Sequence, residues 1–563
     1  MPAKQLKFDD QALDALLRGT AQVAAAVRPT LGPRGRAVMI DRKYGSPQIS
    51  SDGATIVRDI ELPDHFENMG AQLLAEAARK ANDVAGDGTT TAALLAEAMV
   101  EEGVRNLASG ASPIELKRGI EKATQAILAE LDRLSRPLAG RADIAQVATI
   151  SSGSREIGEM IADAMERVTS EGVITVEDSS GIETEVKIVD GMQFDRGFVS
   201  AYLVTDQKGM EAVLEQPLIL VTPRKLSAVA DIVPAMEAAV KAGRPLLVVA
   251  EEIEGEALAT LVVNKVRGTV VACAVKAPGF GDRRTAMLQD LAVLTGAEVI
   301  SEELGLTMEG LTVRQLGSAR RVVVTKDDTT IVEGGGTPDQ VKARVREIDQ
   351  QMELTDSDWD REKLQERKAR LIGGVAVIKV GAPTETALKE RKERVEDALD
   401  ATRAAVAEGI LPGGGRSLLL AAQALSAIQA SGDEQTGVEI VRRALQVPAR
   451  QLAANAGLDG SVALERILGM GPTEGLDVGT LAYGDLLVAG IIDPTKVVKT
   501  SLQSAASVAA MLLTTQALVA DLPEREPAYS GGGEEGMGGM GGMGGMGGMG
   551  GMGGMGDMGD MDF

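Results

Sequence analysis

The sequence has very little cysteine and histidine. One cysteine, Cys273, and one histidine, His65, occur in 563 residues. A single cysteine excludes an intrachain disulfide and every metal site built from several cysteines, and the setting VVACAV indicates a small buried hydrophobic residue in a reducing compartment. A single histidine excludes histidine-rich zinc sites and leaves at most one Ser-His-Asp triad, which the helix-start pattern HFEN disfavours.

Aromatic and basic residues are also scarce. Aromatic residues make up 2% of the chain, so its cores must be built from Ala, Val, Leu and Ile. Lys and Arg number 58 against 82 Asp and Glu, which gives a net charge of −24. A chain this acidic is poorly suited to bind nucleic acid, because that requires a basic face to neutralise phosphates. The hydrophobic share of 44% and charged share of 25% are ordinary for a soluble globular protein.

Targeting and membrane segments are not evident. The N-terminal sequence MPAKQLKFDD lacks the apolar core of a signal peptide, so we expect a cytoplasmic protein. The uncharged stretch 500–520 has the length of a membrane span. It is rich in Ser, Thr and Gln, however, and we predict a buried, closely packed helix there. We therefore expect no contact with a membrane.

Periodicity separates the ends of the chain from its middle. Apolar residues at intervals of three and four predict long helices over about 7–135, with a short β-like interruption at 36–53, and again over 400–528. From about 190 to 375, the short runs LILVT, PLLVVA, TVVACAV, AEVI and RRVVVT alternate with helical patterns. That alternation predicts an α/β domain with a partly parallel sheet. The flanking pieces 136–190 and 375–408 are expected to pair with each other.

The predicted organisation is therefore nested. A helical domain combines 1–135 with 409–525, a small domain combines 136–190 with 375–408, and an α/β domain spans 191–374. The chain crosses each boundary twice, near Pro137 and Gly409 and near Gly191 and Gly374, where glycine would permit a hinge or simply a turn. Residues 526–563 are mostly GGM repeats, which cannot offset their ordering entropy by burial, and are expected to be a disordered tail.

Three glycine-rich segments point to phosphate chemistry, although the chain has no Gly-Lys dipeptide and hence no P-loop. In segment 30–36, TLGPRGR, glycines would let backbone N–H groups approach an anion. In segment 86–91, GDGTTT, a carboxylate that can hold Mg²⁺ precedes a helix start that attracts phosphate. Segment 413–415, GGG, leads into another predicted helix. Each segment alone is most simply a capped helix start, but the three together favour a nucleotide site.

Motifs along the whole chain resemble those of the group I chaperonins. They are TLGPRGR, SDGATIVRDIEL, ENMGAQL, AGDGTTTA, GVITVED, GMQFDRGF, GEALATLVVN, VKAPGFGDRR, DREKLQER, GGVAVIKVG, RVEDALDATRAAV, GILPGGG and GIIDPTKV. The match runs in the expected order from about residue 4 to residue 522, and the GGM tail is also similar. The resemblance implies a multidomain α and α/β chaperonin fold, with a mainly helical equatorial domain, a small α/β intermediate domain and an α/β apical domain in the nested order given above.

The same resemblance implies an activity. Proteins of this family are ATPases coupled to protein folding, and they use ATP, Mg²⁺ and K⁺. They bind non-native polypeptides and enclose them in a ring cavity beneath a ring-shaped co-chaperonin. The expected assembly is a homo-oligomer of two stacked heptameric rings, with which Arg450 and Asp459 are compatible, since they keep opposite charges at the matched inter-ring contact.

Nucleotide-site residues are assigned by the resemblance, position by position. Asp52 and Asp397 match the carboxylates that position and activate the attacking water, and Asp87 matches the Mg²⁺ ligand. The other matched positions are Thr30, Leu31, Gly32, Pro33, Gly88, Thr89, Thr90, Thr91, Gly414, Asp477, Val478 and Asp493. Asp477 stands where the family usually has Asn, which leaves the base contact open. Asp397 lies in the hinge domain, so it is expected to stay away from the pocket until that domain closes.

A K⁺ site is implied near Thr30, Ser51 and Thr90, where the family commonly has Lys in place of Ser51. An apolar client-binding face is implied within 191–374. Its matched residues are Phe198, Tyr202, Leu203, Val233, Met236, Leu258, Val262 and Val263. Their spacing places stripes on helix faces. From the residues alone these stripes would be core-facing, and only the resemblance predicts that they are exposed; Phe198 replaces the more usual Tyr.

Two other functions stay open. A protein that holds clients or scaffolds them without an ATP cycle could dispense with Asp52, Asp87 and Asp397, so their joint presence argues against it. A small-molecule kinase could use the same glycine-rich loops, but no acceptor site is recognisable in the sequence.

Overall fold

The computed structural model describes residues 3–42, 47–168, 173–179, 181–207, 209–355 and 357–522. The predicted tail 526–563 lies outside these residues. The chain divides into a main unit, residues 6–520, and a terminal unit whose described parts are residues 3–5 and 521–522. Within the terminal unit, the Leu522 N–H donates to the Ala3 carbonyl oxygen at 3.3 Å, and Lys4 forms an ion pair with Asp521.

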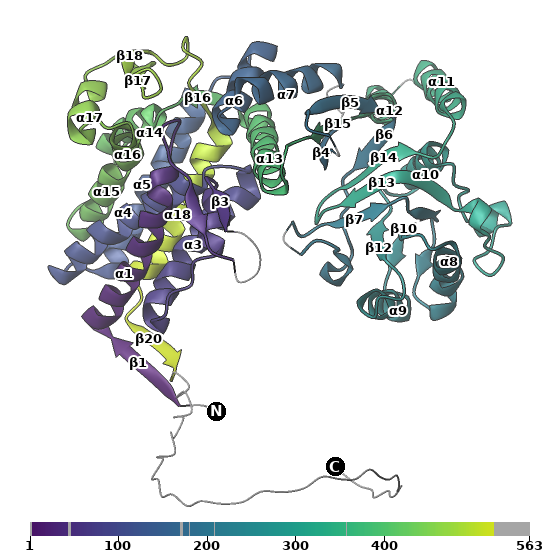
Figure 1. The fold of residues 1–563 in the computed structure, drawn as a ribbon, viewed down its shortest axis with the longest axis horizontal. Coiled ribbons are helices and arrows are strands. Elements are labelled where there is room, and N and C mark those ends of the chain that lie inside the picture. Colours follow the sequence, from purple (N-terminus) through teal and green to yellow (C-terminus); the bar gives the residue numbers. More distant parts are fainter. Residues whose placement is uncertain are drawn as a thin grey trace, which may run out of the picture. The chain divides into compact units, whose positions relative to one another are not determined.

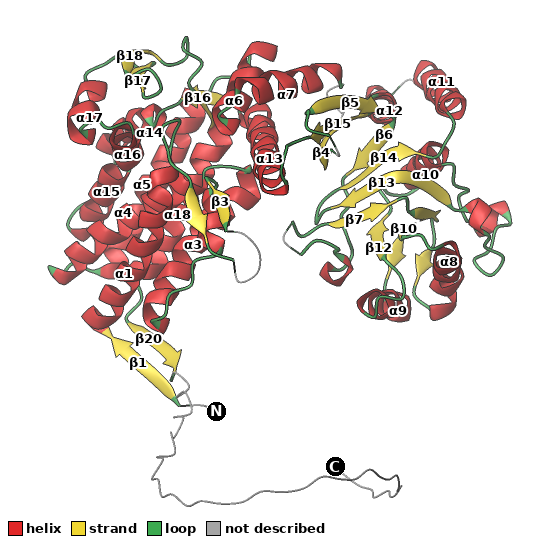
Figure 2. Ribbon diagram, in the orientation of Figure 1, coloured by secondary structure: helices red, strands yellow, loops and turns green. Residues whose placement is uncertain are grey.

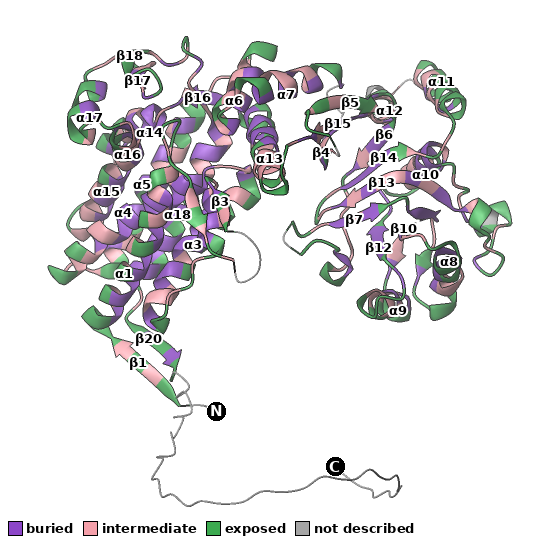
Figure 3. Cartoon of the chain, in the orientation of Figure 1, coloured by how far each residue is buried: buried purple, intermediate pink, exposed green. Residues whose placement is uncertain are grey.

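Long helices from both ends of the chain share one hydrophobic core (Figure 1). They are α1 (Asp9–Val27), α3 (His65–Ala85), α4 (Thr89–Ala108), α5 (Pro113–Leu134), α15 (Asp433–Ala444) and α18 (Thr495–Leu513). Shorter helices are α2 (Gly53–Arg58), α14 (Arg416–Ala421), α16 (Val447–Asn455) and α17 (Gly460–Leu468). Figure 3 shows buried residues concentrated along α4 and α18. The helices predicted in both terminal regions are confirmed.

Glycines let pairs of these helices touch backbone to backbone. A Cβ atom on Gly19 of α1 would lie 1.9 Å from the Glu67 carbonyl oxygen, and one on Gly70 of α3 would lie 2.3 Å from the Leu16 carbonyl oxygen. The pair α5 and α15 repeats this reciprocal arrangement, with Gly119 and Gly437 each facing the other helix. Such close approach leaves no room for a side chain at these positions.

The uncharged stretch 500–520 forms a helix only in part. α18 is deeply buried, as predicted, but it ends at Leu513, and β20 (Ala517–Asp521) follows it. The Thr514 and Thr515 hydroxyls donate to the Met511 carbonyl oxygen at 3.1 and 2.9 Å. Such bonds compete with helix continuation and favour a helix end. Among the described residues, no helix is long and apolar enough to cross a membrane.

The middle of the chain contains a seven-stranded mixed sheet (Figure 2). Its order is β12-β10-β8-β13-β14-β6, and β7 also pairs with β13. The strands are β6 (Gly191–Phe194), β7 (Ala212–Glu215), β8 (Leu218–Val221), β10 (Leu246–Ala250), β12 (Ala272–Lys276), β13 (Gly317–Val324) and β14 (Thr329–Gly334). β8, β10 and β12 are parallel, which confirms the partly parallel sheet. The run AEVI at 297–300 was predicted as a strand, but it supplies only an isolated bridge from Val299 to Val221.

Helices accompany this sheet. They are α8 (Val229–Ala242), α9 (Gly255–Val266), α10 (Asp282–Thr295), α11 (Pro338–Leu354) and α12 (Asp358–Ile372). α8 and α9 connect the parallel strands, as crossover helices must. Cys273 lies in β12 and is fully buried, as predicted, and burial raises the pKa of its thiol to about 12. Its thiol is therefore not a reactive nucleophile at neutral pH.

A second, three-stranded sheet joins two distant parts of the chain. β15 (Val375–Val380) lies between β4 (Val173–Asp178), which is parallel to it, and β5 (Glu185–Val189), which is antiparallel. α6 (Arg141–Ser152), α7 (Arg155–Arg167) and α13 (Glu385–Glu408) share the hydrophobic cluster of this sheet. The expected pairing of segment 136–190 with segment 375–408 is therefore confirmed.

Short contacts mark the places where the chain crosses between these regions. Arg136 and Ile410 exchange backbone hydrogen bonds of 3.0 and 2.8 Å, next to Gly409 at φ 82°. Gly374 has φ 63°, which only glycine adopts easily. The buried carboxylate of Glu177 accepts two bonds, of 2.7 and 3.0 Å, from the Arg320 guanidinium on β13. The domain boundaries themselves stay a prediction.

The remaining strands are short. They are β1 (Lys4–Phe8), β2 (Val38–Ile40), β3 (Gln48–Ser50), β9 (Lys225–Leu226), β11 (Glu252–Ile253), β16 (Ile410–Pro412), β17 (Glu474–Asp477), β18 (Ala482–Asp485) and β19 (Ile492–Pro494). β2 and β3 form the β-like interruption predicted between the first helices.

Candidate functional site

The loop before α4 holds Asp87 between two glycines in the left-handed region. Gly86 has φ 72° and Gly88 has φ 88°. One carboxylate oxygen of Asp87 accepts from the Gly88 N–H at 2.5 Å, and the other accepts from the Ser151 hydroxyl of α6 at 3.0 Å. α4 begins at Thr89, so the predicted arrangement of a loop carboxylate followed by hydroxyls at a helix start is confirmed.

Three other helices crowd this loop. A Cβ atom on Gly86 would lie 2.1 Å from Asp400 Cβ of α13, and one on Gly88 would lie 2.3 Å from Ser501 Oγ of α18. A Cβ atom on Gly53 of α2 would lie 2.5 Å from Thr89 Oγ1. Glycine at these positions therefore brings α2, α13 and α18 against the loop and the start of α4.

Asp52 caps the N-terminus of α2. Its two carboxylate oxygens accept from the Ala54 N–H at 3.0 Å and the Thr55 N–H at 2.7 Å. This capping role, which is common for Asp, was missed from the sequence. The cap fixes the side chain, and each oxygen keeps lone-pair capacity for a further partner.

Asp397 on α13 lies within electrostatic range of Asp52 and Asp87. The pKa of its carboxyl group is raised well above the usual value, first because the group is removed from water and then because Asp52, Asp87, Asp400 and Glu396 are negatively charged. In this conformation α13 is therefore close to the loop, and the expectation that Asp397 leaves the pocket when the hinge domain opens stays a prediction. The close approach results from the packing of α13, whose Ala404 shares a buried cluster with Ala85 of α3 and Val497 of α18.

The pKa values of two neighbouring carboxyl groups, those of Asp87 and Asp493, are also raised. Burial raises the pKa of Asp87, and the charge of Asp52 adds to it, against the opposing bonds from Gly88 and Ser151. Burial and the charge of Asp87 raise the pKa of Asp493 to about 7. Ionised carboxylates held this way are stabilised by a cation.

The site offers hard oxygen donors and no closed metal cage. Within the ranges that the structure describes, no group of three or more His, Cys, Asp and Glu residues is placed to hold a metal ion. Mg²⁺ commonly takes one or two carboxylates and completes its shell with water and phosphate oxygens. A single carboxylate, Asp87, beside a glycine-rich loop at a helix start fits that habit, so the residues present would suit Mg²⁺ together with a nucleotide.

The segment 30–36 lies against the same helix. The Thr30 and Thr90 hydroxyl oxygens are 3.2 Å apart, which brings together two of the three positions implied for K⁺. Ser51, the third, is exposed. The Asn455 side-chain amide of α16 donates to the carbonyl oxygens of Arg28 and Leu31 at 3.0 and 2.9 Å. Asn455 was missed from the sequence, because more than 400 positions separate it from the loop that it holds.

The segment 413–415 lies beside Asp493. β16 and β19 pair Leu411 with Asp493, and the Gly413 N–H donates to the Ile491 carbonyl oxygen at 3.0 Å. Gly414 adopts φ 64°, and a Cβ atom there would lie 3.7 Å from the Leu476 carbonyl oxygen. Leu476 directly precedes the predicted base-contacting pair, so the two loops are neighbours.

That base-contacting pair has its own local bonds. The Asp477 carboxylate accepts from the Gly479 N–H at 2.8 Å and from the Thr480 hydroxyl at 2.6 Å, and Val478 is buried. The Arg34 guanidinium donates to the Gly479 carbonyl oxygen at 2.9 Å, which ties segment 30–36 to this loop. Asp397, Asp87, Asp52 and Asp493 are thus brought together with the threonines and glycines predicted around them.

The predicted client face is exposed only in part. Tyr202 is 70% exposed and Val263 45%, whereas Leu203 and Met236 are buried in the hydrophobic core. The predicted exposure is therefore wrong for Leu203 and Met236. Met236 lies one helical turn after Ile232, on the side of α8 that faces the core. The others, Phe198, Val233, Leu258 and Val262, are half-buried.

Other apolar residues take their place on the same helices. Val229 and Val240 of α8 and Val266 of α9 are all exposed. Figure 3 shows exposed residues along both helices. Spacing could have found two of them, since Val229 lies four residues before Val233 and Val266 three after Val263.

A family model described as the TCP-1/cpn60 chaperonin family matches residues 23–523, which include every element of the site above. The chain belongs to this family. It is therefore a chaperone that assists the folding of other proteins, and membership implies binding of non-native polypeptides by an oligomeric ring.

Proposed function

We propose that this chaperonin is of group I and that it uses ATP hydrolysis to bind, enclose and release non-native proteins. The assembly proposed is two stacked heptameric rings in the cytoplasm, closed by a ring-shaped co-chaperonin. The motifs quoted above for group I, together with the family match, support this choice.

One observation carries the ATPase proposal. Asp397 lies on α13, between two chain crossings, and the charges of Asp52 and Asp87 help to raise the pKa of its carboxyl group. Asp400, one turn later on α13, lies against Gly86, where an added Cβ atom would be 2.1 Å from Asp400 Cβ. Three carboxylates at a site with phosphate-binding backbone are costly in a purely structural core, because each opposes ionisation of the others. Hydrolysis of a nucleotide gives all three a use: a metal ligand and two groups that orient water.

The residues divide the work by their positions. Asp87 would hold Mg²⁺, which supplies charge neutralisation at the phosphates when bound. The backbone and hydroxyls of residues 88–91 and of segment 30–33 would cradle the phosphates, and Thr30 and Thr90 would contribute to a K⁺ site. Asp52, fixed by its cap, would orient the water, and Asp397 would accept its proton. Because Asp397 is contributed by α13, hydrolysis would depend on how that helix is placed.

At the nucleoside end of the nucleotide, Gly414 and Asp493 would contact the ribose, and Asp477 and Val478 would contact the base. The Asp477 carboxylate already accepts three bonds from its own loop. A carboxylate can only accept hydrogen bonds, so it would recognise a base amino group and not a ring nitrogen that lacks hydrogen.

Client binding would use the exposed apolar residues of α8, α9 and the turn at Tyr202. Exposed apolar surface of this kind binds unfolded chains with little shape selectivity. The co-chaperonin would compete for the same surface. Within this surface, Val263 and Val266 are the exposed valines of α9, and Tyr202 is the exposed aromatic residue of the turn.

The test is an ATP-dependent refolding assay on the full-length ring. A chemically denatured, aggregation-prone enzyme is diluted into the chaperonin with Mg²⁺ and K⁺, and recovered activity is measured with ATP, with ADP and with no nucleotide, each with and without co-chaperonin. We expect high recovery only with ATP and co-chaperonin. Equal recovery without nucleotide would indicate a holding protein. Transfer of labelled phosphate to a small molecule instead of water would indicate a kinase.

A further inference from the structure

Arg416 is the first residue of α14, directly after the three glycines at 413–415. Its guanidinium is buried, with 4% of the residue exposed. The Arg416 N–H donates to the Gly413 carbonyl oxygen at 3.0 Å, so the backbone of the arginine closes the glycine loop. An arginine rarely lies this deep without a paired carboxylate.

The side chain bonds to carbonyl groups only. Its two terminal nitrogens donate to the carbonyl oxygens of Ile467 at 3.0 Å and of Met470 and Gly471 at 2.9 Å each. Ile467 lies in the last turn of α17, at the negative end of the helix dipole, and its carbonyl oxygen also accepts from the Met470 N–H at 3.1 Å. The cation therefore binds the carbonyl groups at the end of α17 and of Met470 and Gly471 just beyond it.

Burial lowers the pKa of the Arg416 guanidinium, and the negative charge of Glu474 opposes this shift. The Glu474 carboxylate is held by the same segment, because it accepts from the Gly471 N–H at 2.8 Å. Glu474 starts β17, which runs directly to Asp477 and Val478. The guanidinium thus contacts the segment that leads into the proposed base-contacting loop.

We propose that Arg416 is a positioning residue that holds the ribose-side loop 413–415 and the base-side loop 477–480 as one unit. The inference rests on the proposed nucleotide site and extends it. A Cβ atom on Gly414 would lie 3.7 Å from the Leu476 carbonyl oxygen, so the loops are already neighbours. Arg416 bonds to the Met470 and Gly471 carbonyl groups of the segment that leads to the base-side loop, and to the end of α17, while its own backbone closes the ribose-side loop. The planar guanidinium of arginine presents its donors in a fixed fork, whereas the compact ammonium group of a lysine would not reach all three carbonyl groups in this geometry.

The experiment compares R416M and R416K with a control, R133M, in the full-length ring. Methionine fills similar apolar volume and donates no hydrogen bond. Arg133 lies on α5 with its side chain 70% exposed and pairs only with Glu130 in the described structure, so its loss should change nothing. Mg·ADP affinity is measured by calorimetry, and KM and kcat are measured for ATP.

We expect R416M to weaken Mg·ADP about tenfold and to raise KM by a similar factor, the size of one lost bond to a charged group. The fall in kcat should be smaller than the rise in KM. R416K should weaken binding by about threefold. Unchanged affinity in both variants, with only a lower melting temperature, would overturn the inference. If R416M does not fold, a wild-type affinity of R416K overturns it.

A second readout separates this inference from the proposed function. Hydrogen exchange of the nucleotide-free ring should rise in R416M at both 413–416 and 470–479, because both segments lose the same anchor. A rise confined to 470–479 would overturn the positioning role. A wild-type ring that binds no Mg·ADP would instead contradict the proposed nucleotide site, and the exchange result would still decide the coupling of the loops.

Discussion

The helical core and the seven-stranded sheet solve the packing of a nearly aromatic-free chain in different ways. In the helical core, reciprocal glycines bring the backbones of α1 and α3, and of α5 and α15, into direct contact. Beside the sheet, α8 and α9 bury residues such as Ile232 and Leu261 and leave valines exposed. Backbone contact makes neighbouring helices move together, whereas an exposed apolar face can bind many partners. The first kind of packing suits the transmission of a conformational change, and the second suits the client binding proposed above.

The largest effect is expected from a substitution on α13, which tests whether this helix takes part in ATP hydrolysis at the helical core. Asp397→Ala should lower steady-state ATP turnover by about 10²-fold or more, because a positioned group that accepts a proton is lost. Alanine favours a helix more than Asp, so α13 should persist. ATP affinity should survive, since Asp87 and the glycine loops remain, and the ring should trap a client under its lid.

Paired measurements of ATP binding and hydrolysis check this, with Glu390→Ala as the control. Glu390 lies on the same helix, is partly exposed and pairs with Arg394. Loss of ATP binding in the Asp397 variant would place this residue in the ground-state site. Unchanged hydrolysis would remove it from the reaction.

The second prediction tests backbone contact in the helical core. Gly437→Val on α15 should lower stability by about 3 kcal/mol, because a Cβ atom would lie 2.3 Å from the Leu116 carbonyl oxygen and α5 cannot yield without moving. Urea unfolding with ring assembly monitored by sedimentation measures it. Gly484→Val at an exposed position of strand β18, where nothing lies within 4 Å of the added atom and φ is not positive, controls for the loss of glycine. Equal stabilities of the two variants would contradict the contact.

The third prediction tests the exposed face beside the sheet. Val263→Glu should weaken capture of a denatured client about tenfold, because an apolar contact is replaced by a charge that must be desolvated. Val262→Glu should do the same, with some added loss of stability, since Val262 is half-buried. Basal ATP hydrolysis should be unchanged in both. Fluorescence anisotropy of a labelled client measures capture, and Glu256→Lys on the first turn of α9 is the control; a Val263 variant that binds normally would exclude this face.

The smallest expected effect is a pH dependence of the nucleotide-free protein. Asp493 has a folded pKa of about 7 against about 3.8 when unfolded, so between these values the folded state holds a proton that the unfolded state has released. Stability should therefore fall as pH rises from 4 to 7 and stay low above. Asp493→Asn should remove roughly 1 kcal/mol or more of this loss, because the amide has no charge to bury when pH rises. Urea midpoints at pH 5 and pH 8 in EDTA measure it, and a variant with the wild-type pH difference would contradict the assignment.

Local pattern predicted much of the fold and the loops of the site. The helix starts at Thr89 and Arg416 follow from glycine-rich segments before apolar periodicity, and the pairing of β15 with β4 follows from the nested order. Contacts between distant segments could not be predicted. The bonds from Asn455 to Arg28 and from Ser151 to Asp87 depend on how helices pack, and neither residue carries a local signal.

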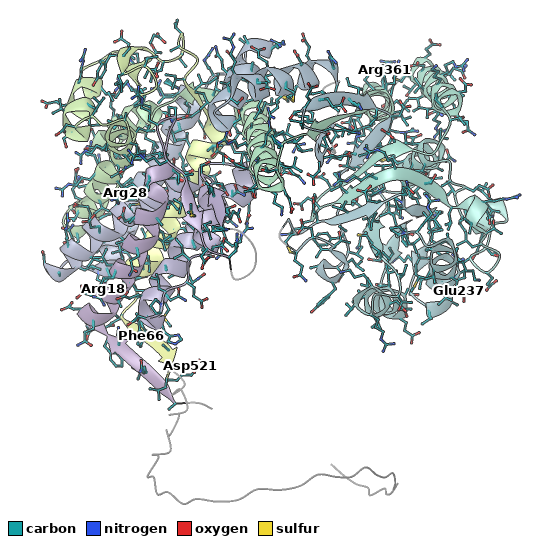
Figure 4. All side chains as sticks on the ribbon, viewed as in Figure 1. Arg18, Arg28, Phe66, Glu237, Arg361 and Asp521 are labelled. Atoms are coloured by element: carbon teal, nitrogen blue, oxygen red, sulfur yellow. The ribbon has the colours of Figure 1, made fainter. Side chains whose placement is uncertain are left out.

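The predicted client face also depends on packing that the sequence does not reveal. Periodicity places Met236 on one side of α8 but cannot say which side meets the sheet, and the structure buries it. Charged side chains are equally ambiguous from sequence. Arg18 and Arg28 lie ten residues apart (Figure 4), and each pairs with one glutamate, Arg18 with Glu67 and Arg28 with buried Glu97. Only the second pair has a buried carboxylate, and only the packing of α4 decides that.

The position of α18 near the C-terminal end of the chain has a consequence for folding during synthesis on the ribosome. α18 contacts α1, α3, α4 and α5, yet it is made only after the whole middle of the chain. At the usual speed of a ribosome, roughly 20 to 70 s separate the end of α5 from the start of α18. During that interval the first four long helices lack their closing partner, while residues 191–334 already contain every strand of their sheet. A newly made subunit of this chaperone is therefore, for the better part of a minute, a chain in need of protection.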